Sequence, residues 1–239
     1  MFYDLEDPVS FASQIYDCLE DNGIWHFEQS YMPSMLRTNS YDTICHEHLE
    51  YYSLNNIIYI LEKVNMKIVD IQFNSINGGS FAITAAKNNG NTNRSNSITS
   101  WLLKQESRMG LETPTPFRRF EERIFNHRLD LMDLLNSLKK DGYKIAGYGA
   151  STKGNVLLQF CELNNSIIDY IVDVNPLKNG CFTPGTSIPI VSEQYALENL
   201  PDFFLVLPWH FRSNILQKEQ HIRDKGVKMI FPLPEIEII

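Results

Sequence analysis

Two short motifs, separated by roughly 100 residues, carry the side chains that can do chemistry in this chain. Residues 45–48 read Cys-His-Glu-His, and residues 147–155 read Gly-Tyr-Gly-Ala-Ser-Thr-Lys-Gly-Asn. A histidine oriented by a carboxylate can remove a proton from a carbon beside a carbonyl group. Glycines between a strand and a helix let the backbone approach a phosphate. The motifs together predict an enzyme that acts on a phosphorylated or nucleotide-linked substrate.

The two histidines of the first motif could have other roles, and the sequence alone does not decide between them. On a strand, His46 and His48 would share a face and could form half of a metal site, with Glu47 pointing away. No third ligand lies nearby in the sequence, so we expect no metal. Alternatively, one histidine packs against Tyr51 and Tyr52 and the other is solvated.

The second motif lacks two well-known signatures. The third glycine of the dinucleotide fingerprint would fall at Thr152 but stands at Gly154. The phosphate loop of nucleoside triphosphatases needs Gly-Lys-Ser/Thr, whereas Asn155 follows Gly154. Phosphate or nucleotide binding and a purely structural turn therefore both remain possible interpretations of the glycines.

An acidic residue downstream bears on the same question. Asp173 follows the next expected strand, at the place of a ribose-binding acid in a dinucleotide site. Its alternative role is to cap the turn at Asn175 and Pro176. With Gly147 and Gly149, Asp173 supports a third, weaker hypothesis, a nicotinamide-dependent oxidoreductase.

The elements that must position these motifs follow an α/β pattern. In the first part, apolar spacing and turn residues predict helices and strands in mixed order, with Asp7 as the cap of the first helix. We expect helices over 8–21 and 55–64 and strands over 24–28, 66–73 and 80–86, the last two joined around 77–79. The polar stretch 88–97 is a candidate boundary.

Alternation of strands and helices becomes regular in the second part, which predicts a parallel sheet with right-handed crossovers. This alternating part begins at Tyr143, with strands over 143–147, 167–172, 203–207 and 227–231 and helices over 152–163, 193–200 and 212–225; helices over 98–109 and 117–140 are expected before it. The predicted fold class is α/β, with a partial half-domain followed by a small Rossmann-like domain.

Composition excludes several classes of protein. The formal net charge of −8 disfavours binding to nucleic acid, and no run of 18 apolar residues predicts a membrane span. The N-terminal residues have neither the basic nor the apolar region of a signal peptide. The four cysteines have no Cys-x-x-Cys spacing, which favours free thiols and a cytoplasmic location.

The motifs resemble the sugar C-methyltransferase family, whose members methylate a ring carbon of a nucleotide-linked (dTDP-type) keto-sugar with S-adenosylmethionine. Residues 41–53 carry the resemblance first, and residues 147–155 look like the start of the family's C-terminal domain. Further similar stretches are 172–178, 182–189, 207–211 and 231–235. The resemblance implies that 1–110 are the end of the methyl-donor domain and that 111–239 are the C-terminal domain.

The resemblance also implies roles for individual residues. His48 matches the family's base, which removes the proton beside the keto group, and Glu47 matches its partner carboxylate. Gly147, Gly149, Ser151 and Lys153 would face the nucleotide diphosphate. Trp209 and His210 would line the same cleft.

The family's zinc domain and its main loop for S-adenosylmethionine would lie before Met1. The resemblance therefore implies a complementing N-terminal fragment, or a second copy of the chain, as a partner. The family often has tyrosine at Cys45, an arginine near Ala82 and a histidine near Asp4. A fragment that binds a nucleotide sugar without catalysis is thus the alternative.

Overall fold

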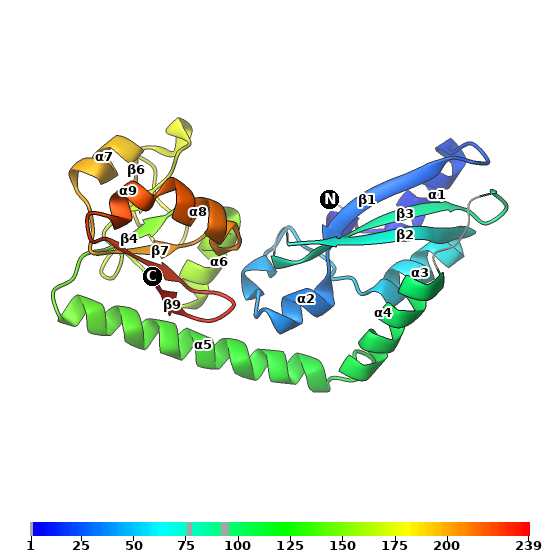
Figure 1. Ribbon diagram of the computed structural model, residues 1–239, viewed down its shortest axis with the longest axis horizontal. Coiled ribbons are helices and arrows are strands. Elements are labelled where there is room, and N and C mark those ends of the chain that lie inside the picture. The colour runs from blue at the N-terminus through cyan, green and yellow to red at the C-terminus, as the bar shows by residue number, and fades with distance from the viewer. Residues whose placement is uncertain (1, 76–77, 92–95) are drawn as a thin grey trace. The chain divides into compact units, whose positions relative to one another are not determined.

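The computed structural model describes residues 2–75, 78–91 and 96–239, and the chain forms two compact units. Unit 1 comprises Met1–Arg37 and His46–Phe120, and unit 2 comprises Thr38–Cys45 and Glu121–Ile239. The chain thus enters unit 2 briefly at Thr38, returns to unit 1 at His46 and leaves again within helix α5 (Thr115–Lys140) (Figure 1).

Unit 1 is built on a three-stranded antiparallel sheet of order β1-β3-β2. Helix α3 packs on β2 and also contacts α1 and α4. The elements are η1 (Phe2–Asp4), α1 (Pro8–Cys18), β1 (Ile24–Ser30), α2 (Met32–Arg37), α3 (Leu54–Lys63), β2 (Met66–Asn74), β3 (Ser80–Lys87) and α4 (Asn96–Met109). The turn predicted at 77–79 and the boundary predicted in 88–97 lie partly outside the described residues.

Local sequence explains where the first helices begin. Asp7 accepts a hydrogen bond from the Ser10 N–H at 2.9 Å, so the predicted cap of α1 is confirmed. Helix α3 starts with a capping box, in which Ser53 and Asn56 each accept from the other's backbone N–H.

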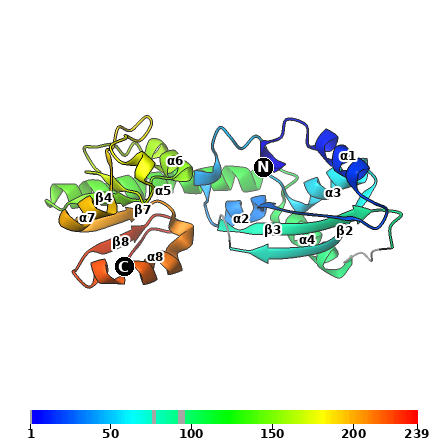
Figure 2. The same cartoon turned by 90° about the horizontal axis from the view of Figure 1, so that it is seen from above.

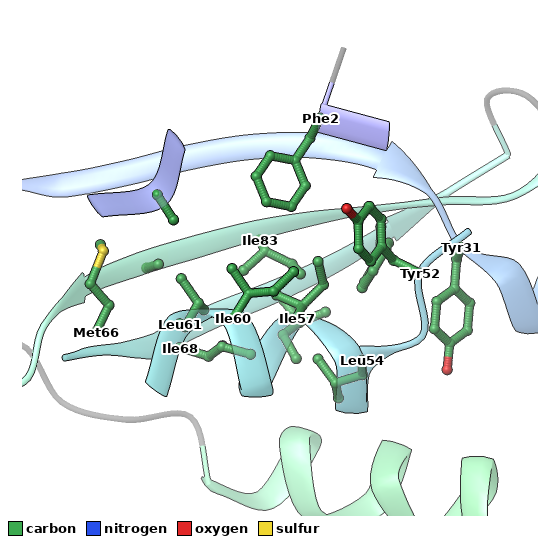
Figure 3. Close-up of a cluster of buried hydrophobic side chains, with 14 of the residues drawn as sticks. Phe2, Tyr31, Tyr52, Leu54, Ile57, Ile60, Leu61, Met66, Ile68 and Ile83 are labelled. Carbon is green, nitrogen blue, oxygen red and sulfur yellow. The ribbon is translucent and has the colours of Figure 1, made fainter. Parts of the chain in front are cut away.

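The core of unit 1 lies between β3 and α3 (Figure 3). Phe81 and Ile83 on the central strand are fully buried, and Ile57 and Leu61 of the helix belong to the same buried cluster. Burying side chains of this size contributes about 1.5–3 kcal/mol each. The apolar spacing that predicted α3 therefore also fixes which of its faces meets the sheet.

Unit 2 contains a six-stranded sheet of order β6-β5-β4-β7-β8-β9, parallel except for β9 (Figure 2). The predicted α/β fold class, with its parallel-rich second domain, is confirmed. The elements are η2 (Tyr41–Thr43), α5, β4 (Ile145–Tyr148), α6 (Thr152–Phe160), β5 (Ile171–Val172), η4 (Pro176–Lys178), β6 (Ile190–Val191), α7 (Glu193–Glu198), β7 (Phe203–Val206), η5 (Trp209–Phe211), α8 (Arg212–Lys218), α9 (Gln220–Arg223), β8 (Lys228–Phe231) and β9 (Glu237–Ile238).

Several predicted elements in unit 2 differ in detail. The helix expected over 212–225 breaks at Glu219, whose buried carboxylate accepts a hydrogen bond from the Tyr148 hydroxyl at 2.7 Å. The strand expected over 167–172 shortens to Ile171–Val172, because the N–H groups of Ile167 and Ile168 bond to Asn164 in a turn. Strands β6 and β9 were not predicted.

The strand order of unit 2 determines where a ligand site is expected. Numbered within the unit, the strands run 3-2-1-4-5-6, as in doubly wound dinucleotide-binding folds, where ligands bind beyond the carboxyl ends of the strands at the switch point. In unit 2 the switch point lies between β4 and β7. The glycine motif follows β4, and Trp209 follows β7. In the described part of the chain, no helix is long and apolar enough to cross a membrane.

Candidate functional site

The Cys-His-Glu-His motif forms a turn and not a strand. His46 and Glu47 make the turn, and both side chains are exposed. His48 is half-buried, with its ring centroid 4.3 Å from that of Tyr3 and 6.4 Å from that of Tyr51. The arrangement leaves one histidine held between aromatic rings and the other in solvent.

Backbone bonds fix the chain just after this turn. The N–H groups of Leu49 and Glu50 both donate to the carbonyl of Tyr3, at 3.0 and 3.2 Å. Glu47 has no hydrogen bond to another described residue. Among the described residues, no group of three or more histidine, cysteine, aspartate or glutamate side chains is placed to hold a metal ion.

The short helix η2, which precedes the turn, belongs to unit 2 and is buried there. Tyr41 and Asp42 are each 2% exposed. The Tyr41 hydroxyl lies 3.1 Å from His127 Nδ1 and 3.4 Å from Cys161 Sγ. The Asp42 carboxylate accepts a hydrogen bond from Trp209 Nε1 at 2.9 Å. Short helix η2 is therefore an integral part of the C-terminal unit.

Asp42 lies in a partly buried cluster with Lys153 and His210. Burial raises the pKa of Asp42, while the Trp209 hydrogen bond and the charge of Lys153 oppose that rise. Burial lowers the pKa of Lys153, opposed by the charges of Asp42 and Cys45. Burial, with a smaller effect of Lys153, lowers the pKa of His210 to about 4, so its ring is neutral at pH 7.

Two buried polar atoms of this cluster have no hydrogen-bond partner within the described structure. They are Oδ1 of Asp42 and Nδ1 of His210. Unsatisfied buried polar atoms are rare in folded proteins and mark functional sites or unseen water. Among the residues predicted to bind substrate, the structure thus brings Lys153, Trp209 and His210 together around Asp42.

The glycines of the second motif have a packing role. A side chain at Gly147 would lie 2.7 Å from Ile171 on the neighbouring strand. Gly149 has a φ of +84°, and a Cβ there would lie 2.9 Å from Pro208. Close approach of strand to strand, and of the loop to the end of β7, therefore requires glycine at both positions.

Two N–H groups of the glycine loop, those of Ala150 and Gly154, donate to side chains within the chain. Asp173 Oδ2 accepts from Ala150 N–H at 2.8 Å and from Lys178 at 3.1 Å, and its Oδ1 accepts from Asn175 N–H at 2.8 Å. Ser151 caps α6 by accepting from Gly154 N–H at 3.0 Å. The structural role considered for Asp173, capping the turn at Asn175, is thus the one that the structure contains.

A pocket of about 350 Å³ opens on the other side of this loop. Gly149 and Ser151 line the pocket together with Asp173 and Lys178. The side chain of Lys153 instead takes part in the Asp42 cluster, so the backbone and the lysine of the motif serve different surroundings. His48 and Glu47 belong to unit 1, and the other predicted site residues belong to unit 2.

Sequence reasoning did not single out Asp42. The residue lies inside the motif that carried the resemblance, so its acidic type was visible. Its burial was not visible, because its hydrogen-bond partner Trp209 is 167 positions away in the chain.

The comparisons with known proteins agree with the family inferred from the motifs. Residues 75–234 match the family of the C-methyltransferase C-terminal domain. The C-methyltransferase NovU of Streptomyces niveus is 32% identical over 238 residues, which are all of this chain and 56% of NovU. The chain thus spans a little over half the length of that relative. With the family match covering two thirds of its residues, the chain belongs to the C-methyltransferase C-terminal domain family.

Proposed function

We propose that this chain is the C-terminal part of an S-adenosylmethionine-dependent C-methyltransferase that acts on a nucleotide-linked, dTDP-type keto-sugar. The observation that carries the proposal is the environment of His48. This imidazole is half-buried against Tyr3 and directly follows a turn with a carboxylate, within a chain of the C-methyltransferase family.

In the proposed reaction, His48 removes the proton from the carbon beside the keto group. The electrons of the C–H bond form the enolate, and the imidazole becomes positively charged. Glu47 precedes His48 in the chain and would stabilise that charge electrostatically. His48 is half-buried beside Tyr3, whereas His46 of the same turn is exposed.

Three residues around Asp42, but not Asp42 itself, support nucleotide-sugar binding in unit 2. Lys153 carries a positive charge at the first turn of α6, where a diphosphate would be attracted both to the amine and to the helix N-terminus. Trp209 and His210 lie at the carboxyl end of β7, beside that turn in the topology. We assign the nucleotide part of the substrate to these residues.

S-adenosylmethionine would supply the methyl group that the enolate attacks. At the glycine turn after β4, the Ala150 N–H already donates to Asp173, so this N–H is not available to the cofactor. We propose that the main contacts to the methyl donor come from a complementing fragment and not from this turn.

A complementing fragment is the partner that unit 1 favours. In the described residues β1 pairs with β3 alone, so its other edge can accept a further strand. Ile24 on this strand is 55% exposed. A second copy of the chain at the same edge is the alternative, and sedimentation of the chain alone would give a dimer in that case.

The decisive test is exchange of the substrate's C–H proton. A dTDP-linked keto-sugar is incubated with the chain in D2O without methyl donor, and deuterium at the carbon beside the keto group is followed by NMR. We expect His48→Asn to lower the exchange rate by about 100-fold or more. The matched control is His46→Asn, which removes the exposed histidine of the same turn and should exchange at the wild-type rate.

Calorimetry separates catalysis from binding. We expect the chain to bind the dTDP-linked sugar and to bind S-adenosylmethionine weakly or not at all. Sugar binding without proton exchange would instead identify a non-catalytic binding fragment. Micromolar binding of S-adenosylmethionine by this chain alone would contradict the assignment of the donor site.

A further inference from the structure

The segment Thr38–Cys45 belongs to unit 2, although the chain on both sides of it belongs to unit 1. Four consecutive side chains in it are nearly inaccessible: Ser40 is 1% exposed, and Tyr41, Asp42 and Thr43 are each 2% exposed. Connecting segments normally run over a protein surface. Burial of this one therefore depends on specific attachments.

Tyr41 makes the first attachment. His127 Nε2 donates to the carbonyl of Pro232, and burial lowers the pKa of His127, so the ring is neutral and its Nδ1 is an acceptor. The Tyr41 hydroxyl consequently donates to that nitrogen, at 3.1 Å. The Tyr41 ring also packs against Phe160, with the centroids 5.0 Å apart.

Asp42 makes the second attachment. Its carboxylate accepts a hydrogen bond from the indole N–H of Trp209. The charge of Lys153, at the first turn of α6, acts on the same carboxylate. A buried carboxylate is costly unless charge and hydrogen bonds compensate it. An amide could accept from Trp209 equally well, but it would not respond to the charge of Lys153, which opposes the rise that burial causes in the pKa of Asp42.

Backbone hydrogen bonds connect the anchored residues Tyr41 and Thr43 to Ile44 and Cys45, which precede the His46–His48 turn. Ile44 N–H donates to the carbonyl of Tyr41 at 2.9 Å, and Cys45 N–H donates to that of Thr43 at 3.1 Å. Within unit 2, the segment up to Cys45 is thus attached to the carboxyl end of β7 and the start of α6, and His46 is the next residue in the chain.

We infer that Asp42, assisted by Tyr41, is a positioning residue through which the C-terminal unit holds the stretch of chain that leads into His48. Asp42 itself does not act on the substrate. The anchoring is a property of the structure alone, whereas its effect on turnover rests on the function proposed above.

Hydrogen exchange tests the anchoring without any substrate. Asp42→Asn keeps an acceptor for Trp209 and removes the charge, and Tyr41→Phe removes only the hydroxyl. We expect the amides of Ile44 and Cys45 to exchange about tenfold faster in Asp42→Asn, the size that loss of one charged, buried interaction gives. Tyr41→Phe should give a several-fold increase at the same amides.

The matched control is Asp202→Asn. The Asp202 carboxylate also accepts a hydrogen bond in unit 2, from Lys144 N–H at 2.7 Å, but it has no contact with the anchored segment. Exchange at Ile44 and Cys45 should stay at the wild-type rate in this variant. If Asp42→Asn does not fold, the Tyr41→Phe variant tests the anchoring alone. Wild-type exchange rates of the Ile44 and Cys45 amides in a folded Tyr41→Phe protein would overturn the inference.

Kinetics distinguishes positioning from a structural or binding role. In the proton-exchange assay we expect Asp42→Asn to lower kcat about tenfold and to change KM by less than about twofold. A raised KM with unchanged kcat would overturn positioning in favour of substrate binding. If His48→Asn exchanges the substrate proton at the wild-type rate, the proposed function is wrong. Faster exchange of the Ile44 and Cys45 amides in Asp42→Asn would still support the anchoring of residues 38–45 by Asp42.

Discussion

The indole Nε1 of Trp209 donates a hydrogen bond to the carboxylate of Asp42 over 2.9 Å, and both side chains are buried. This bond joins the motif that carries the proposed base to the carboxyl end of a central strand of the C-terminal sheet. A neutral donor to a buried carboxylate contributes more than an ordinary hydrogen bond, because the unpaired charge would be costly.

Removing the donor should therefore destabilise the chain. We expect Trp209→Phe to lower the free energy of unfolding by about 2 kcal/mol, measured by urea denaturation followed by circular dichroism. In an Asp42→Ala background the same change should cost about 1 kcal/mol less, because no carboxylate remains to be left unpaired. Strictly additive effects of the two substitutions would contradict a direct interaction.

A second prediction concerns the carboxylate that closes the glycine loop. Asp173→Ala removes the acceptor for Ala150, Asn175 and Lys178 at once. Since the side chain of Asp173 is only 9% exposed, we expect a loss of about 2 kcal/mol in the same denaturation experiment. The control is Asp141→Ala, at an exposed turn of the same unit, which should lie within about 0.5 kcal/mol of wild type. Equal stability of the two variants would mean that the loop does not depend on Asp173.

Much of the architecture could be predicted from the sequence because it depends on local patterns. The 3.6-residue spacing gave α3 and the cap at Asp7 gave the start of α1, since both signals lie within a few residues. The burial of Glu219 at the helix break could not be predicted, because its hydrogen-bond partner, Tyr148, is 71 positions away. Strand β9 escaped prediction because two residues carry no periodicity.

Some residues of the candidate site could likewise be predicted from local sequence, and others could not. His48, Lys153 and His210 could be identified from residue type and motif. Asp42 could not, because its environment arises only when residues 38–45 join the C-terminal unit. A charge in a polar-looking stretch predicts a solvated side chain, and only the fold shows it buried.

The third prediction is a pH dependence that arises from His210. Its pKa falls from 6.5 in the unfolded chain to about 4 in the folded protein, so protonation favours unfolding between these values. The stability that the neutral ring contributes is complete above about pH 6.5 and is lost as the pH falls towards 4. His127 acts in the same direction, and the raised pKa of Asp42 acts in the opposite one.

Urea denaturation at several pH values measures this dependence. We expect His210→Gln to flatten the decline in unfolding free energy between pH 6.5 and 4 by on the order of 1 kcal/mol, after allowance for the partial exposure of the ring. His221→Gln, at an exposed position, is the control and should decline like wild type. Parallel curves for His210→Gln and wild type would show that the ring does not stay neutral in the folded state.

The fourth prediction concerns the buried carboxylate of unit 1. Glu106 on α4 accepts hydrogen bonds from the Tyr31 hydroxyl at 2.7 Å and from the N–H groups of Leu54 and Asn55 at the start of α3, at 2.6 and 3.1 Å. The negative charge also complements the positive end of that helix. Glu106→Gln keeps the shape of the side chain, but it replaces one acceptor oxygen with a donor and removes the charge.

We therefore expect Glu106→Gln to destabilise unit 1 by about 2 kcal/mol and to speed amide exchange in the first turn of α3. Glu112→Gln, an exposed change in the same region of the chain, serves as the control. Exchange in β4 and β7 of unit 2 should be the same in both variants, because the hydrogen-bond partners of Glu106, which are Tyr31, Leu54 and Asn55, all belong to unit 1. An unchanged first turn of α3 in Glu106→Gln would show that Ser53 and Asn56 cap this helix without the carboxylate.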